Sequence, residues 1–283
     1  MSHEWLYFRI RSDPRLGRSL LVDGIAPMVR DMARALPIEG WWWLFKSDSR
    51  GSAIRLRVSV PPDACTRVAA AMSAALTAAG HEFSLPYYEP ELLLFGGPHG
   101  IDAAHEFFCA DSAFVSAWAG RERSATGALI PEALSLALVL RLLHAAGLDL
   151  FERWDVFHGV ARMRTFGNLE DPRYQPYEAL VQRILSAGPG KIVQLYLDDE
   201  QRKDDGLLAA HVAFLDTFGR DLSALYSGGF LECGLREFCV PLILFHWNRL
   251  LLSPFAHFGL SHALARELDR AIRPTPAPAG ARG

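Results

Sequence analysis

The chain has 283 residues, half of which are apolar, so it is long enough to bury one large core or two modest ones. Its formal net charge is -3, from 29 basic and 32 acidic side chains that are mixed along the sequence. This mixture contains no long basic tract, so the composition does not suggest a nucleic-acid partner.

Four cysteines, Cys65, Cys109, Cys233 and Cys239, are spread along the chain. Their spacing matches neither a zinc-binding template nor the framework of a small disulfide-rich domain. Residues 5–11 also lack the basic, apolar and small-residue zones of a signal peptide. We therefore expect reduced thiols and a cytoplasmic protein.

The most apolar stretch, residues 128–148, has the length of a membrane span. Glu132, Arg141 and His144 interrupt this stretch, and Pro131 stands where a helix would begin. These four residues favour a buried helix of a globular protein, so we expect no membrane partner.

Residues 1–100 have the pattern of a sheet-rich half. Aromatic and branched residues at 5–11 suit one strand, and residues 41–60 are typical of a hairpin around a turn at 46–52. Residues 83–88 suit a further strand. Between them, Asp63 is expected to cap an alanine-rich helix that ends near Gly80. This order predicts an α+β fold, in which the helix covers an antiparallel or mixed sheet.

From residue 101 onward the periodicity of apolar residues is helical. We expect helices at roughly 101–117, 130–146, 152–165, 174–187, 207–226, 235–250 and 257–271. No low-complexity linker separates the halves 1–100 and 101–272, so we expect them to pack as one compact unit. The composition of residues 273–283 predicts a disordered tail.

The second strand of the hairpin has two different faces. Apolar side chains at alternate positions from 54 to 60 share one face, whereas Arg55 and Arg57 project from the other. Two guanidiniums on one face make a positive surface that suits a carboxylate or an enolate-like oxygen. The alternative is a solvated face with structural ion pairs, for example to Glu89 or Glu91.

Residues 88–97 set Glu89 and Glu91 beside a proline and ahead of an apolar run. Carboxylates are costly to bury without neutralising partners, so this stretch is either a solvated strand entrance or the rim of a site. If the two glutamates face Arg55 and Arg57 across adjacent strands, the opposite charges neutralise each other. That arrangement predicts the rim of a site.

Polar residues also interrupt two of the predicted helices. His105, Asp111 and Ser112 lie on or just after the first, where either capping or a role in a site explains the last two. His246 follows a buried run and precedes Asn248. It is either a satisfied core histidine or, if it faces a cleft, a group that transfers protons near neutral pH.

Motifs for the common cofactor-dependent and hydrolytic reactions are missing. The sequence contains no glycine-rich phosphate loop, no GxSxG elbow, no HExxH and no CxxC. The glycine clusters at 96–100 and 228–229 lack the spacing of a dinucleotide-binding turn. These chemistries are therefore poorly supported.

Taken in order, several of these segments resemble the thiopeptide-type bacteriocin biosynthesis family. Its members are free-standing relatives of the C-terminal elimination domain of class I lantibiotic dehydratases. The matching segments lie at residues 5–9, 55–57, 88–97, 104–105, 111–112, 145–149 and 245–250. The resemblance therefore covers nearly the whole chain.

The resemblance implies one of two reactions on a ribosomally made precursor peptide. In elimination, a glutamyl ester on Ser or Thr is expelled to leave dehydroalanine or dehydrobutyrine. In pyridine synthesis, two dehydroalanines undergo a formal [4+2] cycloaddition, and water and the leader peptide are then lost. Neither reaction needs a metal or redox cofactor. The implied partners are the precursor with its leader and a glutamyl-transferase dehydratase, and a homodimer is left open.

The resemblance assigns functional residues only at matching positions. Arg55 and Arg57 match the strand arginines of the elimination domain, and Glu91 matches the glutamate of its Tyr-x-Pro-Glu motif. That motif continues to an arginine where this chain has Leu94, and the elimination histidine is expected where it has Leu244. A glutamate leaving group needs cations to receive it, so the loss of an arginine argues against elimination.

We therefore predict a lyase-type enzyme in which pyridine formation ranks ahead of glutamate elimination. A non-catalytic module that binds the precursor peptide for a partner enzyme is a further alternative. The predicted catalytic residues are Arg55 and Arg57, which polarise an amide oxygen, and Glu91 or His246, which moves a proton. The predicted substrate-binding residues are Tyr88, Glu89, Asp111, Ser112, Asn248 and Arg249.

Overall fold

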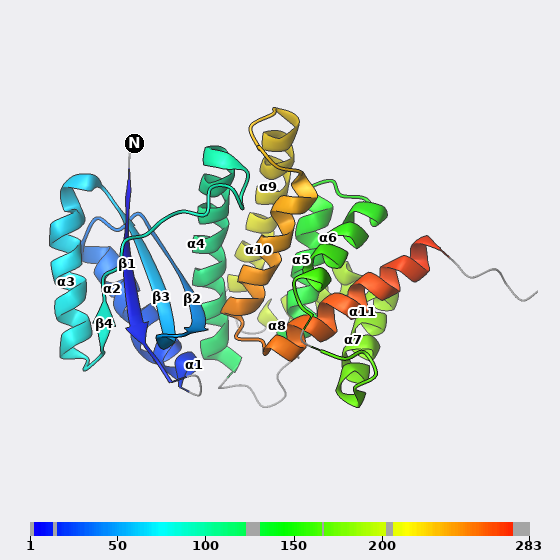
Figure 1. Ribbon diagram of the computed structural model, residues 1–283, viewed down its shortest axis with the longest axis horizontal. Helices are drawn as coiled ribbons and strands as arrows, with labels where there is room; N and C mark the ends of the chain where they lie inside the picture. Colours follow the sequence, from blue (N-terminus) through cyan, green and yellow to red (C-terminus); the bar gives the residue numbers. More distant parts are fainter. Residues whose placement is uncertain (1–2, 14–15, 123–130, 166, 202–205, 274–283) are drawn as a thin grey trace, which may run out of the picture. The chain divides into compact units, whose positions relative to one another are not determined.

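The computed structural model describes residues 3–13, 16–122, 131–165, 167–201 and 206–273 (Figure 1). The chain forms two compact units whose segments alternate along the sequence. Unit 1 takes in residues 1–128, 207–211 and 245–251, and unit 2 takes in residues 129–206, 212–244 and 252–283. The boundary predicted near residue 100 lies within unit 1, and the predicted tail, apart from Arg273, lies outside the described residues.

Unit 1 contains a four-stranded antiparallel sheet with the strand order β2-β3-β1-β4. The strands are β1 (Glu4–Arg11), β2 (Gly40–Asp48), β3 (Gly51–Val60) and β4 (Phe83–Ser84). β2 and β3 form the predicted hairpin. Gly51, with a φ of 91°, begins β3 in a conformation that other residues rarely adopt. The α+β fold class is thus confirmed.

Cross-strand pairing decides which side chains share a face of the sheet. Tyr7 pairs with Arg57, which pairs with Trp42, so these three residues lie in one row on one face. Phe8, Leu56 and Trp43 form the next row, on the opposite face, where they are almost fully buried. The sheet therefore has one apolar face and one face that carries arginine among aromatic rings.

Helices lie on both sides of this sheet (Figure 1). α3 (Cys65–Ala78) packs against β1 and buries its apolar stripe, whereas α4 (Gly97–Glu122) packs against β2. Three helical segments precede β2 and were not predicted: α1 (Gly17–Ser19), the π-helix η1 (Leu20–Ile25) and α2 (Ala26–Ala35). The arginine-bearing face is thereby positioned toward α4.

Two details of the predicted sheet half were wrong. The strand expected at 83–88 contains only Phe83–Ser84, because Pro86 has no amide hydrogen to continue the ladder. Asp63 does not cap α3 with its side chain, because it lies inside a 3-10 turn, η2 (Pro62–Ala64). Gly80, with a φ of 73°, follows the end of α3 as expected.

The remaining described residues are mostly helical, as predicted. Besides α4, the elements are α5 (Pro131–Ala145), α6 (Leu150–Arg162), the 3-10 turn η3 (Pro172–Tyr174), α7 (Gln175–Ala187), α8 (Pro189–Gln201), α9 (Leu207–Ser227), α10 (Leu235–Arg249) and α11 (Pro254–Ile272). Every predicted helix is present with shifted ends, and α8 was not predicted.

Close helix contacts hold unit 2 together. A Cβ atom at Gly219 of α9 would lie 2.6 Å from the Cβ of Ala145, so glycine allows α9 to approach the end of α5. Arg141 of α5 and Asp216 of α9 form a two-pronged ion pair, with nitrogen–oxygen distances of 2.7 and 2.6 Å. Leucines of α5 are buried, as expected for a core helix, and no described helix combines the length and the apolar character of a membrane span.

Candidate functional site

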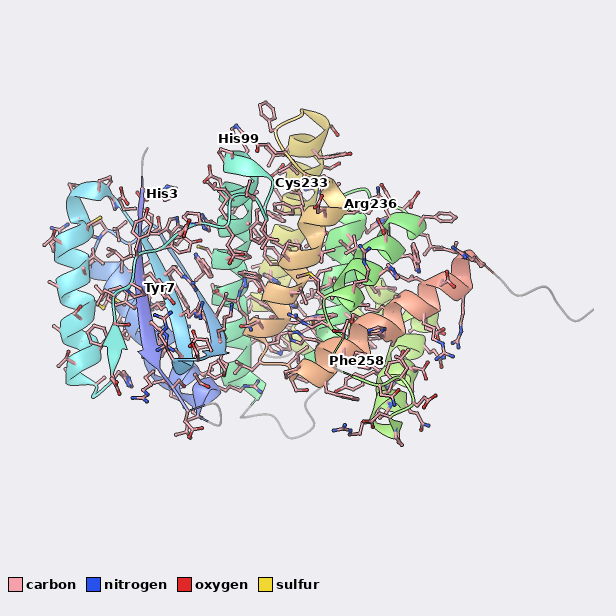
Figure 2. The ribbon with its side chains drawn as sticks, viewed as in Figure 1. His3, Tyr7, His99, Cys233, Arg236 and Phe258 are labelled. Carbon is pink, nitrogen blue, oxygen red and sulfur yellow. The ribbon has the colours of Figure 1, made fainter. Side chains whose placement is uncertain are left out.

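The guanidinium of Arg57 lies among three aromatic rings on the polar face of the sheet in unit 1. Its central carbon is 4.4 Å from the ring centre of Tyr7, 4.2 Å from Trp42 and 5.4 Å from Tyr88. Tyr7, in β1, is labelled in Figure 2. The Nη1 atom donates a hydrogen bond to the backbone oxygen of Arg55 at 3.0 Å. Ring faces rather than carboxylates therefore hold this cation.

Arg57 is only 6% exposed, yet it keeps its charge at neutral pH. Burial lowers its pKa to about 10, against the opposing influence of Tyr7, Tyr88 and Glu91. Among the described residues, no carboxylate forms an ion pair with it. A buried cation without a paired anion is suited to stabilising negative charge on a bound oxygen.

Arg55 projects from the same face but has a different partner. Its Nη2 donates to Asp48 Oδ2 at 2.6 Å, and Arg9 donates to the other carboxylate oxygen at 3.1 Å. The backbone amide of Arg50, followed by Arg55 and Arg9, holds the pKa of Asp48 below its usual range. Of the two alternatives raised by the sequence, Arg55 fits a structural ion pair, although the partner is Asp48 and not Glu89 or Glu91.

The segment that carries Glu89 and Glu91 is a loop between β4 and α4, so a strand entrance is excluded. Both glutamates are exposed. The negative charge of Glu91 raises the pKa values of Arg57 and Tyr88, so its carboxylate acts electrostatically on both side chains. Within the described part of the chain, that carboxylate makes no hydrogen bond. Glu91 is therefore an exposed base candidate beside a buried cation.

Tyr88 connects this loop to α4. Its hydroxyl lies 2.7 Å from Nε2 of His105, whose ring is 4.6 Å from the ring of Trp5. Burial, with His3 and Arg57, lowers the pKa of His105 to about 4, so this imidazole is neutral at pH 7. Burial also raises the pKa of Tyr88 above its usual range, so the phenol is protonated in the free protein.

Several nitrogen atoms in this cluster are buried without a hydrogen-bond partner among the described residues. They are Nε of Arg57, Nε1 of Trp5, Nε1 of Trp42 and Nδ1 of His105. The first three are donors only, and leaving a buried donor unpaired costs about 1–3 kcal/mol. Donors of this kind suit oxygen acceptors, such as the carbonyl groups of a peptide.

Asp111, His246 and Arg249 form a second cluster, which is buried inside unit 1. The carboxylate of Asp111 lies 2.8 Å from His246 Nδ1 and 3.0 Å from Arg249 Nε. Burial alone would raise the pKa of Asp111, but His246 and Arg249 outweigh it and lower that pKa to about 2. Removing one partner of such a group leaves an uncompensated buried charge, so the geometry fits a structural role. The catalytic role of His246 and the binding roles of Asp111 and Arg249 stay predictions.

Ser112 and Asn248 complete the outer edge of β2. Ser112 Oγ accepts a hydrogen bond from the amide of Trp43 at 3.2 Å, and Asn248 Oδ1 accepts one from the amide of Phe45 at 3.0 Å. The sulfur of Cys109 accepts a hydrogen bond from the backbone amide of Trp41. Side chains of α4 and α10 thus bind three alternate amides of the strand. Both predicted binding residues fit this structural role, and their contact with substrate stays a prediction.

Of the predicted residues, Arg57, Tyr88 and Glu91 come together at one place, with Glu89 exposed in the same loop. Arg55 lies beside them in the hairpin, whereas Asp111, Ser112, His246, Asn248 and Arg249 belong to the buried parts of unit 1. Trp5, Tyr7 and Trp42 were not predicted as site residues, and His105 was predicted without a role of its own. The alternation of side chains between the two faces of β1 and β2 could have predicted these aromatic residues, because it places them on the arginine-bearing face.

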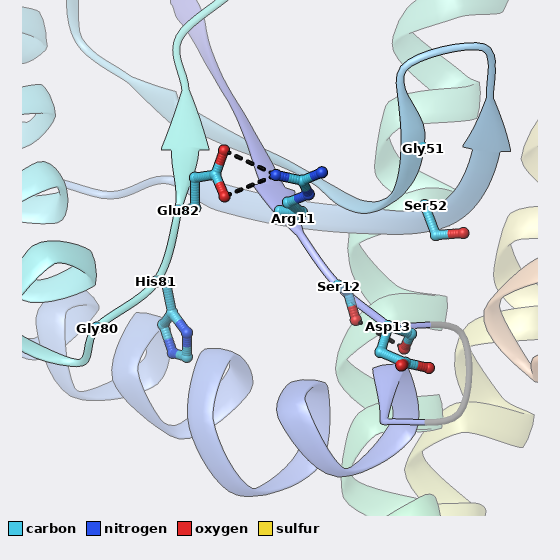
Figure 3. A pocket seen from close by; sticks show the side chains of 8 residues that line it. All are labelled: Arg11, Ser12, Asp13, Gly51, Ser52, Gly80, His81 and Glu82. Atoms are coloured by element: carbon cyan, nitrogen blue, oxygen red, sulfur yellow. Dashed lines mark hydrogen bonds and ion pairs between the residues drawn. The ribbon is translucent and has the colours of Figure 1, made fainter.

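A separate cavity of about 430 Å³ lies at one end of the sheet (Figure 3). It is lined by Arg11, Ser12, Asp13, Gly51, Ser52, Gly80, His81 and Glu82. Arg11 Nη1 already binds both carboxylate oxygens of Glu82, at 3.1 and 2.9 Å. Elsewhere too, the described residues contain no group of three or more His, Cys, Asp or Glu side chains arranged to hold a metal ion. The Arg57 cluster is therefore the stronger candidate.

A family model described as "Lantibiotic biosynthesis dehydratase C-term" matches residues 5–268. The chain belongs to this family. This membership confirms the resemblance drawn from the short segments, and it identifies a family of peptide-modifying enzymes related to lantibiotic and thiopeptide biosynthesis. A sequence comparison with curated proteins finds no match.

Solved structures share the fold at low sequence identity. The tRNA-dependent lantibiotic dehydratase MibB from Microbispora sp. 107891 has 21% identity and a TM-score of 0.68, and the match covers 95% of this chain and 28% of MibB. TsrL has 16% identity and a TM-score of 0.62, with coverage of 97% of this chain and 100% of TsrL. The pyridine synthase TbtD from thiomuracin biosynthesis has 16% identity, a TM-score of 0.45, and coverage of 95% and 98%. This family member thus spans little more than a quarter of MibB.

Proposed function

We propose that this family member forms a pyridine ring in a dehydrated ribosomal precursor peptide, by formal [4+2] cycloaddition of two dehydroalanines, and releases the leader peptide. The supporting observation is the composition of the Arg57 cluster. It keeps the strand arginine and Glu91, whereas the position of the elimination arginine is Leu94, a leucine that is 38% exposed. The loop therefore lacks a cation that would receive a departing glutamate.

The chemistry requires an amide to act as part of a diene. Moving one proton from the amide nitrogen to its oxygen creates the necessary C=N bond next to the C=C bond of the first dehydroalanine. Addition to the C=C bond of the second dehydroalanine then forms two C–C bonds, one at the CH2 carbon of the first dehydroalanine and one at the former amide carbon. Loss of water and of the leader then makes the ring aromatic. In this proposal Arg57 polarises the amide oxygen and Glu91 takes the nitrogen proton.

Glu91 suits this proton transfer better than His246. The carboxylate of Glu91 is exposed and acts electrostatically on Arg57, whereas His246 is 3% exposed and is held by Asp111. The loop around Glu91 also exposes large apolar side chains: Leu85, Tyr87, Leu92, Leu93 and Leu94. Such a surface suits contact with a peptide substrate. A glutamyl-transferase dehydratase would supply the dehydroalanines.

Mass spectrometry of the cognate precursor tests the proposal. Incubation with the dehydrated peptide is expected to give a product that has lost water and the leader. Glu91→Gln is expected to lower the rate by about 100-fold, the loss typical of a removed proton-transfer group. Glu39→Gln is the matched control, because it removes an exposed carboxylate to which no role in the site is assigned. Failure of the unmodified protein to release the leader would reject the proposal.

Glutamate elimination is the second candidate, because Arg55 and Arg57 keep the positions of the elimination arginines on one sheet face. In the same assay, a glutamylated precursor would lose glutamate and would keep its leader. The third candidate, a non-catalytic module that presents the peptide, is favoured by the exposed leucines at 92–94. A module that only presents the peptide would give neither product. Its contribution to the activity of a partner enzyme would be unchanged by alanine substitutions at Arg55, Arg57 and Glu91.

A further inference from the structure

We propose that Tyr88 gives a proton to the substrate amide oxygen, and that His105 is a positioning residue that holds the Tyr88 hydroxyl by donating a hydrogen bond from Nε2. The inference depends on the proposed function, because that reaction needs a proton at the amide oxygen. Beyond the proposed function, it assigns the source of this proton and the tautomer of the buried His105.

The hydrogen bond between Tyr88 and His105 has two directions, and only one leaves a proton for the substrate. The Tyr88 Oη to His105 Nε2 distance is 2.7 Å. If the phenol donates, its single proton points at the imidazole and Nδ1 carries the other N–H. If Nε2 donates, the phenol proton is free to face a bound oxygen and Nδ1 is an unprotonated acceptor.

The surroundings of His105 favour donation from Nε2. Nδ1 is buried and has no hydrogen-bond partner among the described residues. Among buried backbone groups, N–H donors without a partner are rarer than under-satisfied acceptors, and the same preference on Nδ1 favours its unprotonated state. The neighbouring charge of Arg57 also disfavours a second proton on the imidazole. A neutral ring with its proton on Nε2 satisfies both conditions.

Arg57 and Glu91 provide the rest of the proton transfer. The Glu91 carboxylate takes the proton of the amide nitrogen while the Tyr88 hydroxyl gives its proton to the amide oxygen. The phenolate that forms lies near the Arg57 guanidinium, which is 5.4 Å from the Tyr88 ring. The protonated Glu91 then returns a proton to Tyr88 through solvent. The amide thus becomes its neutral imidic-acid tautomer, which has a C=N bond and an O–H group. Both side chains return to their starting protonation states.

The tautomer is tested directly by NMR spectroscopy of the full chain labelled with ¹⁵N-histidine. We expect the His105 signals, identified by their absence in His105→Gln, to show a protonated Nε2 and an unprotonated Nδ1. Tyr88→Phe should shift the Nε2 signal. A protonated Nδ1 would overturn the proposal. This readout needs no substrate, so it is independent of the proposed function.

Kinetics with the dehydrated precursor test the catalytic part. Tyr88→Phe is expected to lower kcat by about 100-fold, in the range of a lost acid catalyst, with a smaller change in KM. Tyr226→Phe is the matched control, because Tyr226 lies on α9, outside this loop, and is 49% exposed. An unchanged kcat in Tyr88→Phe would reject its role as proton donor.

Two substitutions separate positioning by His105 from simple packing. His105→Gln keeps an N–H donor and is expected to keep kcat within about 10-fold, whereas His105→Leu should match Tyr88→Phe. Equal losses in both variants, with unchanged melting temperatures, would assign His105 a packing role and contradict the proposal. If the unmodified protein makes no pyridine, the catalytic part fails together with the proposed function, and the NMR result still decides the hydrogen-bond direction.

Discussion

At the scale of single residues, Arg57 differs from Arg55 in what holds its charge. Arg55 forms an ion pair with Asp48, whereas the guanidinium of Arg57 lies among the rings of Tyr7, Trp42 and Tyr88. A planar guanidinium stacks on such rings, and a lysine ammonium does not reproduce this geometry. The shape of the cation therefore matters at this position as well as its charge.

Arg57→Lys is expected to lower the free energy of unfolding by about 1–2 kcal/mol, because it removes stacking contacts in a buried site. It should also lower turnover of the precursor by roughly 100-fold, the cost of misplacing one group that stabilises an oxyanion. Urea denaturation and mass spectrometry measure the two effects. Arg67→Lys, on an exposed residue of α3, is the control. Turnover equal to that of the unmodified protein would contradict the role of Arg57.

Acid is expected to destabilise the protein in two steps. Burial, as the first cause, lowers the pKa values of His105 and His211 from 6.5 to about 4. Between these values the unfolded chain binds protons that the folded chain excludes, so the free energy of unfolding falls as the pH decreases from 6.5 to 4. Asp111, with a pKa of about 2 instead of 3.8, continues the loss below pH 3.8, because its paired carboxylate must be protonated.

Urea denaturation at a series of pH values measures this dependence. Each pKa unit corresponds to about 1.4 kcal/mol, so the fall from 6.5 to about 4 in both histidines corresponds to at most about 7 kcal/mol. His105→Gln should make the decline between pH 6.5 and 4 shallower. An unfolding free energy that is constant over this interval would show that these imidazoles titrate normally in the folded protein.

The sequence predicted Arg57, Tyr88 and Glu91 as site residues because each belongs to a short recognisable segment. It did not identify Trp5, Tyr7 or Trp42, because their approach to Arg57 depends on the register between strands. The Asp48 partner of Arg55 was missed for a related reason. The hairpin turn brings the Asp48 carboxylate back to Arg55. Charge alone could not distinguish Asp48 from Glu89 or Glu91 as the ion-pair partner.

At the scale of elements, α4 has two functions in unit 1. His105 contributes to the Arg57 cluster, whereas Cys109 and Ser112, further along the helix, bind the amides of Trp41 and Trp43. One helix therefore both supports the candidate site and completes the edge of the sheet. A change at Ser112 is expected to act on stability first.

Ser112→Ala should lower the free energy of unfolding by about 1–3 kcal/mol, because it leaves the buried amide of Trp43 without an acceptor. Ser116→Ala is the matched control, since Ser116 is equally buried on α4 but donates only to the oxygen of Ala113 in its own helix. Chemical denaturation of both variants measures the difference. A Ser116 variant as unstable as the Ser112 variant would show that the edge hydrogen bond adds nothing.

Helices were easier to predict than the ends and short strands of the fold. Long apolar periodicity indicated α5, α9 and α10, although it did not indicate α8 or the helical segments of residues 17–35. In the latter region, Leu21, Ile25 and Val29 are buried at a spacing of four, a signal that Gly24 and Pro27 obscured. β4 is short because prolines follow it, which local propensity around Phe83 did not reveal.

At the scale of the whole molecule, the two units are not consecutive pieces of chain. Residues 207–211 and 245–251 belong to unit 1, although most of their neighbours in sequence belong to unit 2. The first of these segments contains His211, and the second contains His246, Asn248 and Arg249. The periodicity of apolar residues cannot predict that the chain returns to unit 1. This return depends on long-range contacts, such as those of the buried Asp111 with His246 and Arg249.

A fragment of residues 1–128 is therefore expected not to fold on its own. It lacks His246 and Arg249, so Asp111 would be buried without a partner, at a cost of about 3–5 kcal/mol. It also lacks Asn248, the acceptor for the amide of Phe45. Dispersed amide signals in an NMR spectrum of this fragment would contradict the expectation, and the full chain provides the reference spectrum.

The side chains along β2 also affect how copies of the protein meet. An unpaired outer strand is a template on which a strand of another molecule adds, and such addition is a common route to fibres. Along β2, Cys109, Ser112 and Asn248 already bind the amides that an incoming strand would need. A second copy cannot extend the sheet there without first displacing α4 and α10. Strand addition at β2 is therefore not an expected route to a homodimer, and the sheet is protected from edge-to-edge aggregation on this side.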